Sequence, residues 1–152
     1  MSIKIFNTFS EKETQKLAGL ILADLIKKSP KDGALILSLQ GDLGSGKTTF
    51  TQGLAKFLKI KNRITSPTFV IQKKFSIFNF QFSKLYHIDA YRLQKSEEIL
   101  ELGWHEIISN PKNIVVIEWP EKIKKFLPKQ THFLKFKFIT ETHREVKLLK
   151  KC

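Results

Sequence analysis

Residues 34–50 read ALILSLQGDLGSGKTTF, and this stretch decides the fold. Its apolar first part is typical of a parallel strand that is covered on both faces of a sheet. Its second part, residues 41–48, has the Walker A spacing of one glycine, four residues and then Gly-Lys-Thr. Apolar residues then recur at helical intervals as far as Leu58. The stretch therefore predicts a strand, a phosphate-binding loop and a helix in direct succession.

The residue types of this loop suit phosphate binding for physical reasons. Glycines let the backbone adopt conformations closed to other residues and approach a ligand closely. Backbone amides and the N-terminal end of the following helix then attract phosphate oxygens. The lysine reaches the β- and γ-phosphates, and the threonine hydroxyl binds Mg²⁺. A purely structural corner would not need lysine and threonine there. We therefore expect ATP and Mg²⁺ to bind through Gly41, Asp42, Leu43, Gly44, Ser45, Gly46, Lys47, Thr48 and Thr49.

The remaining patterns predict an α/β fold of the P-loop NTPase kind, with a mostly parallel central sheet, flanking helices and antiparallel edge strands. Strands are expected over residues 3–6, 34–39, 69–77, 84–88 and 113–118, with a hairpin over residues 132–139 and 144–149. Helices are expected over residues 10–28, 47–58, 96–102 and 121–126. Ser10 and Glu13 form a capping box at the first of these helices. We assign the inward helix faces to Leu17, Leu20, Ile21 and Leu25, and to Phe50, Leu54, Phe57 and Leu58.

The length suits one compact domain, which we expect to span residues 1–152. The one cysteine, Cys152, has no second cysteine to pair with, which fits a reducing compartment. No signal peptide is recognisable, and no apolar run approaches the ~20 residues needed to cross a bilayer. We therefore expect a cytoplasmic protein that does not contact membranes.

The formal charge is +13, from 27 basic and 14 acidic side chains. Such a charge attracts nucleic acid, acidic proteins or anionic membranes. The only arginines are Arg63, Arg92 and Arg144, however, and the abundance of Lys, Ile, Phe and Asn is also what an A+T-rich genome produces. Since clustered arginines would favour nucleic-acid binding, the composition leaves open whether the charge forms a dedicated patch.

Two carboxylates follow apolar strands and are candidates for the second metal ligand that a P-loop enzyme needs. Glu118 ends the run Ile114-Val115-Val116-Ile117, and Asp89 ends Leu85-Tyr86-His87-Ile88. Alone, either one could be a surface carboxylate or a helix cap. Beside a phosphate-binding loop, we expect one of them to hold Mg²⁺ and the other to position the attacking water.

The histidines and aromatic residues have a functional and a structural interpretation. His87 precedes Asp89 by two residues, so it shares a strand face with it and either supports the site or fills a structural place. His105, His132 and His143 lack metal-ligand spacing. Tyr91 and Arg92 could clamp phosphate or bind tRNA, and Arg92 could instead pair with a carboxylate. Base stacking is one interpretation of Phe75, Phe78, Phe80 and Phe82, but core packing of a hairpin is favoured.

Four segments together resemble the TsaE (YjeE) family of bacterial P-loop ATPases. They are GDLGSGKTTF at residues 41–50, SPTF at 66–69, HIDAYRL at 87–93 and IEWPE at 117–121. Their order and spacing agree with the family, and the first helix with Thr14 matches more loosely. The resemblance covers nearly the whole chain. Ala90 stands where another apolar residue is usual and Ser45 where alanine is common, and neither difference alters the chemistry.

The resemblance implies an ATPase that assists synthesis of N6-threonylcarbamoyladenosine in tRNAs reading codons that start with A, without catalysing the transfer. It implies binding to a TsaB–TsaD heterodimer, which ATP hydrolysis resets between turnovers. It also implies that the chain contacts tRNA indirectly or through a basic surface. We expect the isolated chain to be a monomer. By matching motif positions, Thr48 and Glu118 would ligate Mg²⁺, Asp89 and Lys47 would serve hydrolysis, and Thr68 would sense the γ-phosphate. Trp119 and, less directly, Thr14 would lie beside the nucleotide.

Two other functions compete with this one. A small kinase would transfer phosphate to a small-molecule acceptor, but the sequence shows no obvious lid or acceptor segment. A GTPase would carry Asn-Lys-x-Asp for guanine, and residues 61–63 read KNR, which is not that motif. An ATPase is therefore favoured, with the small kinase as the alternative. Without an evident arginine finger, we expect slow hydrolysis by the chain alone.

Overall fold

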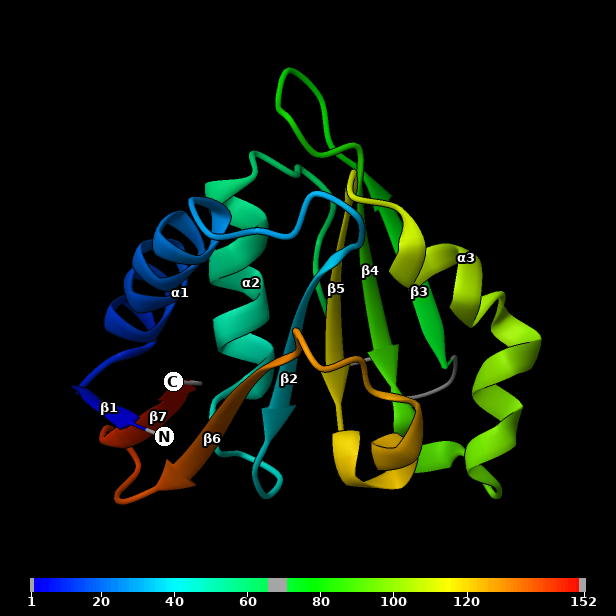
Figure 1. Ribbon diagram of the computed structural model, residues 1–152. Coiled ribbons are helices and arrows are strands. Elements are labelled where there is room, and N and C mark those ends of the chain that lie inside the picture. Colours follow the sequence, from blue (N-terminus) through cyan, green and yellow to red (C-terminus); the bar gives the residue numbers. More distant parts are fainter. Residues whose placement is uncertain (1, 66–70, 151–152) are drawn as a thin grey trace.

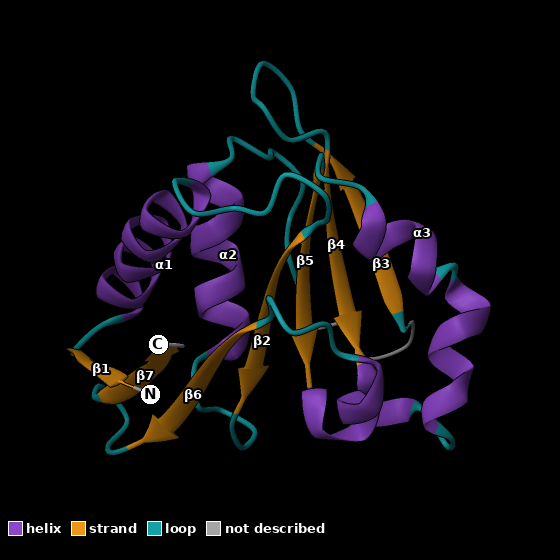
Figure 2. Cartoon of the chain, in the orientation of Figure 1, coloured by secondary structure: helices purple, strands orange, loops and turns teal. Residues whose placement is uncertain are grey.

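The computed structural model describes residues 2–65 and 71–150, and its strands form a mixed sheet of order β1-β7-β6-β2-β5-β4-β3 (Figures 1 and 2). The strands are β1 (Ser2–Thr8), β2 (Leu35–Gln40), β3 (Gln72–Ser76), β4 (Lys84–Asp89), β5 (Asn113–Glu118), β6 (His132–Phe138) and β7 (Arg144–Lys150). The helices are α1 (Glu11–Ile26), α2 (Lys47–Phe57) and α3 (Trp104–Ser109), with 3₁₀ turns η1 (Ala90–Arg92), η2 (Ser96–Leu102) and η3 (Pro120–Phe126).

The predicted sheet architecture is confirmed. Strands β6, β2, β5 and β4 run parallel in the centre, while β3 joins one edge and the β7–β1 pair joins the other in antiparallel pairing. The predicted hairpin of the last two strands is β6–β7. The N-terminal strand pairs with β7, so the first and last strands of the chain lie side by side (Figure 1). This pairing at the sheet edge could not be predicted from local patterns.

The apolar central strands are covered on both faces, which explains why they do not alternate with polar residues. Leu35, Leu37 and Leu39 of β2 face the core beneath α1 and α2. Ile36 faces a second core, which contains Trp104 of α3 together with residues of η2 and η3. Figure 1 shows these two helical layers on opposite sides of the sheet. Both faces of the strand that leads into the P-loop are therefore held by packing.

The N-terminus of α1 is capped nearly as predicted. The Ser10 side chain accepts a hydrogen bond from the Glu13 amide at 3.1 Å. The Glu13 carboxylate reaches back to the amide of Phe9, also at 3.1 Å, one residue before the expected Ser10 amide. The assignment of Leu20 to the inward face of α1 is wrong, because its side chain is exposed. The 3.6-residue period places it beside the buried stripe of Leu17 and Ile21, pointing to solvent.

Helix α2 packs closely on α1 through Gly53. A Cβ atom at this position would lie 2.4 Å from the backbone oxygen of Gln15, so only glycine allows this approach. Leu54 and Leu58 are buried as expected, whereas Phe57 lies at the margin of the helix pair and is partly exposed. The contact fixes the start of α1 relative to α2, and with it one wall of the cleft described below.

The second helical layer differs from expectation in two details. The helix α3 was not predicted, because its six residues are too few to show a period. The segments expected as helices at 96–102 and 121–126 are 3₁₀ turns. Among the described residues, no helix combines the length and the apolar character that crossing a bilayer requires.

The aromatic cluster after β3 is only partly core. Phe82 is buried and Phe75 packs against the core, as the favoured interpretation requires. Phe78 and Phe80 are exposed, so core packing is wrong for these two side chains. They lie in the β3–β4 loop, which projects beyond the end of the sheet (Figure 1).

Candidate nucleotide-binding site

Three neighbouring parallel strands end together and bring the candidate residues to one edge of the sheet. Strand β2 leads directly into the P-loop, β5 ends at Glu118 and β4 ends at Asp89. Because β5 lies between β2 and β4, Glu118 is level with Leu39 on one side and Asp89 on the other. Adjacent strands are about 4.8 Å apart. The two carboxylates that the sequence left as alternatives are therefore next to each other and next to the loop.

The loop has the backbone of a phosphate cradle. Gly44 and Gly46 adopt φ angles of 77° and 107°, which side chains disfavour. A Cβ on Gly41 would lie 2.6 Å from the Phe136 carbonyl oxygen, so the loop can sit against β6 only with glycine there. The buried Ser45 hydroxyl has no hydrogen-bond partner in the described part of the chain. These features fit a loop whose polar groups are completed by a bound anion.

The Lys47 ammonium group is engaged by the protein itself. Its Nζ donates a hydrogen bond to the Gly41 carbonyl oxygen and lies 4.3 Å from the centre of the Trp119 ring. Burial lowers the pKa of Lys47, while the nearby charges of Glu118 and Asp89 act in the opposite direction. These two contacts hold the Lys47 ammonium group at the phosphate-binding loop.

A buried hydrogen bond holds the carboxylate of β5. His87 Nε2 lies 2.6 Å from Glu118 Oε2, and both side chains are almost fully buried. His87 Nδ1 has no partner among the described residues. The contact fits an imidazole that holds the Glu118 carboxylate in place. Of the two interpretations of His87, support of the site is therefore favoured.

Asp89 occupies a different environment although it is the neighbour of Glu118. Its Oδ1 accepts a hydrogen bond of 2.9 Å from the Tyr91 amide, which caps the 3₁₀ turn η1. Burial raises the pKa of Asp89, the negative charge of Glu118 raises it further, and the hydrogen bond from Tyr91 opposes both effects. A carboxyl group with a raised pKa at a nucleotide site has the properties of a group that orients water or accepts a proton.

The donor set fits Mg²⁺ better than a transition metal. Among residues 2–65 and 71–150, no group of three or more His, Cys, Asp or Glu side chains is arranged to hold a metal. Mg²⁺ usually takes only one or two carboxylates and completes its shell with water and substrate phosphates. Glu118 and the Thr48 hydroxyl, both at the cleft, are such a partial set.

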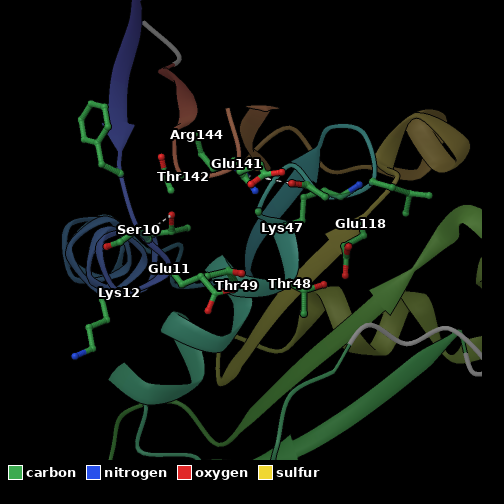
Figure 3. A pocket seen from close by; sticks show the side chains of 15 residues that line it. Ser10, Glu11, Lys12, Lys47, Thr48, Thr49, Glu118, Glu141, Thr142 and Arg144 are labelled. Atoms are coloured by element: carbon green, nitrogen blue, oxygen red, sulfur yellow. Dashed lines mark hydrogen bonds between the residues drawn. The ribbon is translucent and has the colours of Figure 1, made fainter. Parts of the chain in front are cut away.

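A cleft of about 670 Å³ opens beside the loop (Figure 3). Its walls come from the start of α1, from residues 43–49 and from the turn between β6 and β7. In Figure 3 the side chains of Ser10 and Lys12 lie on one side, and those of Lys47 and Glu118 lie on another. Thr14, a predicted contact, lines the cleft, although its hydroxyl is 2.7 Å from that of Thr8.

Sequence reasoning missed several residues that line the cleft, and Phe9 and Arg144 are the two whose contacts shape it. Phe9 lies at the mouth and stacks on His143, with ring centroids 4.5 Å apart. Arg144 donates from Nε to the Gly44 carbonyl oxygen at 3.1 Å, packs on Phe138 and so braces the P-loop from β7. An arginine in a chain with 24 lysines and only two other arginines was a usable signal. Phe9 gave no such signal, because the ring that it stacks on comes from the opposite end of the chain.

The last two predicted site residues are Trp119 and Thr68. Trp119 follows Glu118 with a φ of 59°, and this left-handed turn puts its ring over Lys47 and 5.0 Å from the Tyr91 ring. Trp119 is thus beside the phosphate-binding loop. Thr68 lies outside the described residues.

Comparison with known proteins gives consistent matches. A family model described as threonylcarbamoyl adenosine biosynthesis protein TsaE matches residues 8–146. The tRNA threonylcarbamoyladenosine biosynthesis protein TsaE of Rickettsia conorii is 43% identical over 119 residues, which are 78% of this chain and 62% of that protein. The protein of the same name from Bacillus subtilis is 35% identical over 141 residues, 93% of this chain and 82% of that protein.

A solved structure extends the comparison to three dimensions. The crystal structure of Bacillus subtilis YdiB matches with a TM-score of 0.68 at 28% sequence identity. The match covers 97% of this chain and 84% of that one. The sheet with parallel central strands and antiparallel edges is therefore shared with a solved structure. The chain spans less than two thirds of the length of the Rickettsia relative and more than four fifths of the Bacillus relative.

Proposed function

This chain belongs to the TsaE family of threonylcarbamoyl adenosine biosynthesis proteins, and from that premise we propose that it binds ATP with Mg²⁺ and hydrolyses it in support of tRNA modification. One observation carries the proposal: the P-loop, Glu118 and Asp89 converge at the ends of three adjacent parallel strands. A corner that served packing alone would need neither the lysine of the loop nor two buried carboxylates beside it.

Each part of the loop has a role in binding ATP. The backbone amides of residues 41–49 bind phosphate oxygens, helped by the N-terminal end of α2. Lys47 leaves the Gly41 carbonyl and the Trp119 ring and binds the β- and γ-phosphates. The nucleoside lies in the cleft between Phe9, Thr14 and Arg144. Arg144 holds the loop in shape through the Gly44 carbonyl.

A second set of residues acts in hydrolysis. Thr48 and Glu118 hold Mg²⁺, with Glu118 oriented by His87. When bound, Mg²⁺ neutralises the negative charge that develops on the β- and γ-phosphates. Asp89 orients the attacking water, which its raised pKa and its position beside Glu118 support. Thr68, which precedes β3 in the sequence, senses the γ-phosphate.

The partner is a TsaB–TsaD heterodimer. The chain acts as a single cytoplasmic P-loop domain and is monomeric alone, and its ATP hydrolysis resets that heterodimer between rounds of N6-threonylcarbamoyladenosine synthesis on tRNAs that read A-starting codons. The guanidinium of Arg144 is engaged by the loop and by the Thr140 carbonyl, so it does not serve as an arginine finger. We therefore expect slow hydrolysis by the chain alone and faster hydrolysis in the complex.

The test is phosphate release from ATP by the purified chain, with and without TsaB–TsaD from the same source. We expect weak basal activity, stimulation by the heterodimer, and loss of both in Lys47→Ala. Rapid hydrolysis by the isolated chain would contradict the partner dependence. No stimulation, together with phosphate on a small-molecule acceptor, would replace the ATPase with the small kinase.

A further inference from the structure

A second groove lies at the end of the molecule opposite the P-loop. It has a volume of about 570 Å³ and lies between residues 57–62, at the end of α2, and residues 76 and 78–80, at the β3–β4 loop. The P-loop precedes α2 and the groove follows it. Because α2 has 11 residues, the two sites are about 17 Å apart along the helix axis. In Figure 1 the β3–β4 loop projects at the top, whereas β2 enters the P-loop at the bottom.

Three phenylalanine rings at this groove are exposed to solvent, and two of them contact neighbouring rings. Phe78 is 77% exposed, Phe80 44% and Phe57 37%. Phe80 stacks on the buried Phe82 with centroids 6.0 Å apart and meets Phe57 edge-on at 6.4 Å. Asn79, between the two exposed rings, has a φ of 57°, which turns the loop there. Leaving such rings in water forfeits about 2 kcal/mol each compared with burying them, which is characteristic of a contact surface.

The segment that carries both walls of the groove has charge of one sign. Residues 43–88 contain no Asp or Glu, but they contain Lys47, Lys56, Lys59, Lys61, Arg63, Lys73, Lys74 and Lys84. Lys59 and Lys61 line the groove and are exposed. Within the described residues, no ion pair to a carboxylate involves either one. A ligand here meets cations and aromatic faces.

We propose that this groove binds an unpaired stretch of tRNA, with bases stacked on Phe78 and Phe80 and phosphates beside Lys59 and Lys61. Aromatic platforms flanked by cations are how proteins bind single-stranded nucleic acid without reading its sequence. The groove's well-exposed side chains are mainly aromatic or cationic, which suits bases and phosphates better than the aliphatic anchors of a protein segment. The choice of tRNA over other RNA rests on the proposed function. The groove itself is independent of the nucleotide site.

The experiment is fluorescence anisotropy of the full chain with a labelled tRNA transcript and with labelled oligouridine, at several salt concentrations. We expect Phe78→Ala and Phe80→Ala each to weaken binding roughly five- to one-hundred-fold. Lys59→Gln with Lys61→Gln removes two phosphate contacts. This double variant should reduce the slope of log affinity against log salt by about 1.4. ATP binding, measured on the same samples, should remain that of the unaltered chain.

Matched control variants distinguish a specific RNA-binding site from general electrostatic attraction between the basic chain and RNA. Leu20→Ala removes an equally exposed apolar side chain from α1, and Lys135→Gln with Lys137→Gln removes the same charge from exposed positions on β6. Both controls should bind tRNA normally. Equal losses in the controls and the groove variants would overturn the proposal, as would failure of the unaltered chain to bind either RNA.

Three outcomes tell this inference apart from the proposed function. If the chain hydrolyses ATP with TsaB–TsaD but binds no RNA, the groove proposal fails and the ATPase stands. If Phe78→Ala and Phe80→Ala keep RNA binding but lose stimulation by TsaB–TsaD, the groove docks a protein and the tRNA assignment is wrong. RNA binding at the groove in a chain that does not hydrolyse ATP would refute the ATPase alone.

Discussion

His87 Nε2 lies 2.6 Å from Glu118 Oε2, and the two side chains are buried at the carboxyl ends of the adjacent strands β4 and β5. A buried carboxylate that must bind a cation needs a partner that holds it without neutralising it permanently. A hydrogen-bonded imidazole would meet this need at the proposed Mg²⁺ site, as outer residues that orient the ligands do in known metal sites.

The first prediction concerns this pair. His87→Ala leaves Glu118 buried without its partner, which we expect to destabilise the fold by about 3–5 kcal/mol. His87→Gln keeps an N–H donor near the same point and should recover most of that stability. In the Gln variant, we expect the Mg²⁺ concentration for half-maximal hydrolysis to rise about 10–100-fold. Thermal unfolding measures the stability of the two variants, and Mg²⁺ titrations of the hydrolysis rate measure the Mg²⁺ dependence. Unchanged Mg²⁺ dependence in the Gln variant would mean that His87 is structural only.

The second prediction uses Trp119 as a reporter of Lys47. Lys47 Nζ lies 4.3 Å from the Trp119 ring centre and must leave it to bind the β- and γ-phosphates. ATP should therefore change tryptophan fluorescence, and AMP, which lacks those phosphates, should not. Trp119→Phe should abolish the change, since the other tryptophan, Trp104, is almost fully buried and donates its Nε1 hydrogen to the Phe126 carbonyl oxygen, away from the Lys47 ammonium group. A full ATP signal in Trp119→Phe would contradict the proposed movement.

The third prediction follows from the raised pKa of Asp89, which burial and Glu118 cause. In the unfolded chain Asp89 ionises near its ordinary pKa of 3.8. A folded-state pKa above that value favours folding below pH 3.8, and this contribution is lost as the pH rises through the raised pKa. Asp89→Asn keeps the acceptor for the Tyr91 amide and removes the charge. It should therefore be more stable than the unaltered chain at pH 7, by a margin that shrinks toward pH 4.

The same substitution should uncouple binding from hydrolysis. We expect Asp89→Asn to bind ATP normally and to lose about 100-fold or more in kcat, which is typical of removing a group that manages the proton of the attacking water. Calorimetric binding and single-turnover hydrolysis measure the two separately. Equal loss of both would show that Asp89 shapes the site and does not act on the water.

The fourth prediction compares two helical glycines. Gly53→Ala would place a Cβ 2.4 Å from the Gln15 backbone and push α1 from α2, so we expect a loss of at least about 1–3 kcal/mol despite the better helix propensity of alanine. Gly19→Ala meets only the Phe57 side chain at 3.4 Å and should gain up to about 1 kcal/mol. Thermal denaturation of the two variants measures both changes in stability. Similar melting temperatures for the two variants would refute the close contact.

Much of the fold could be predicted because its signals are local. The apolar run of β2, the glycine spacing of the loop and the Ser10 cap each depend on residues a few positions apart. Some predictions went wrong for local reasons, as for Leu20 beside the buried stripe of α1, and others because the three-dimensional arrangement decided the outcome. Phe78 and Phe80 alternate like core residues, but the loop that carries them projects beyond the sheet. The candidate site shows the same limit, since Phe9 and Arg144 reach the cleft from opposite ends of the chain.

Local patterns in the sequence were enough to predict that a strand, a phosphate-binding loop and a helix follow one another, because backbone freedom at glycine and apolar periodicity act within neighbouring residues. They also indicated which two carboxylates end buried strands. Only the tertiary structure decided that β5 lies between β2 and β4, so that Glu118 and Asp89 stand side by side next to the P-loop and His87 contacts Glu118. Strand order depends on how crossover helices pack on both faces of the sheet, and that packing joins residues far apart in the chain.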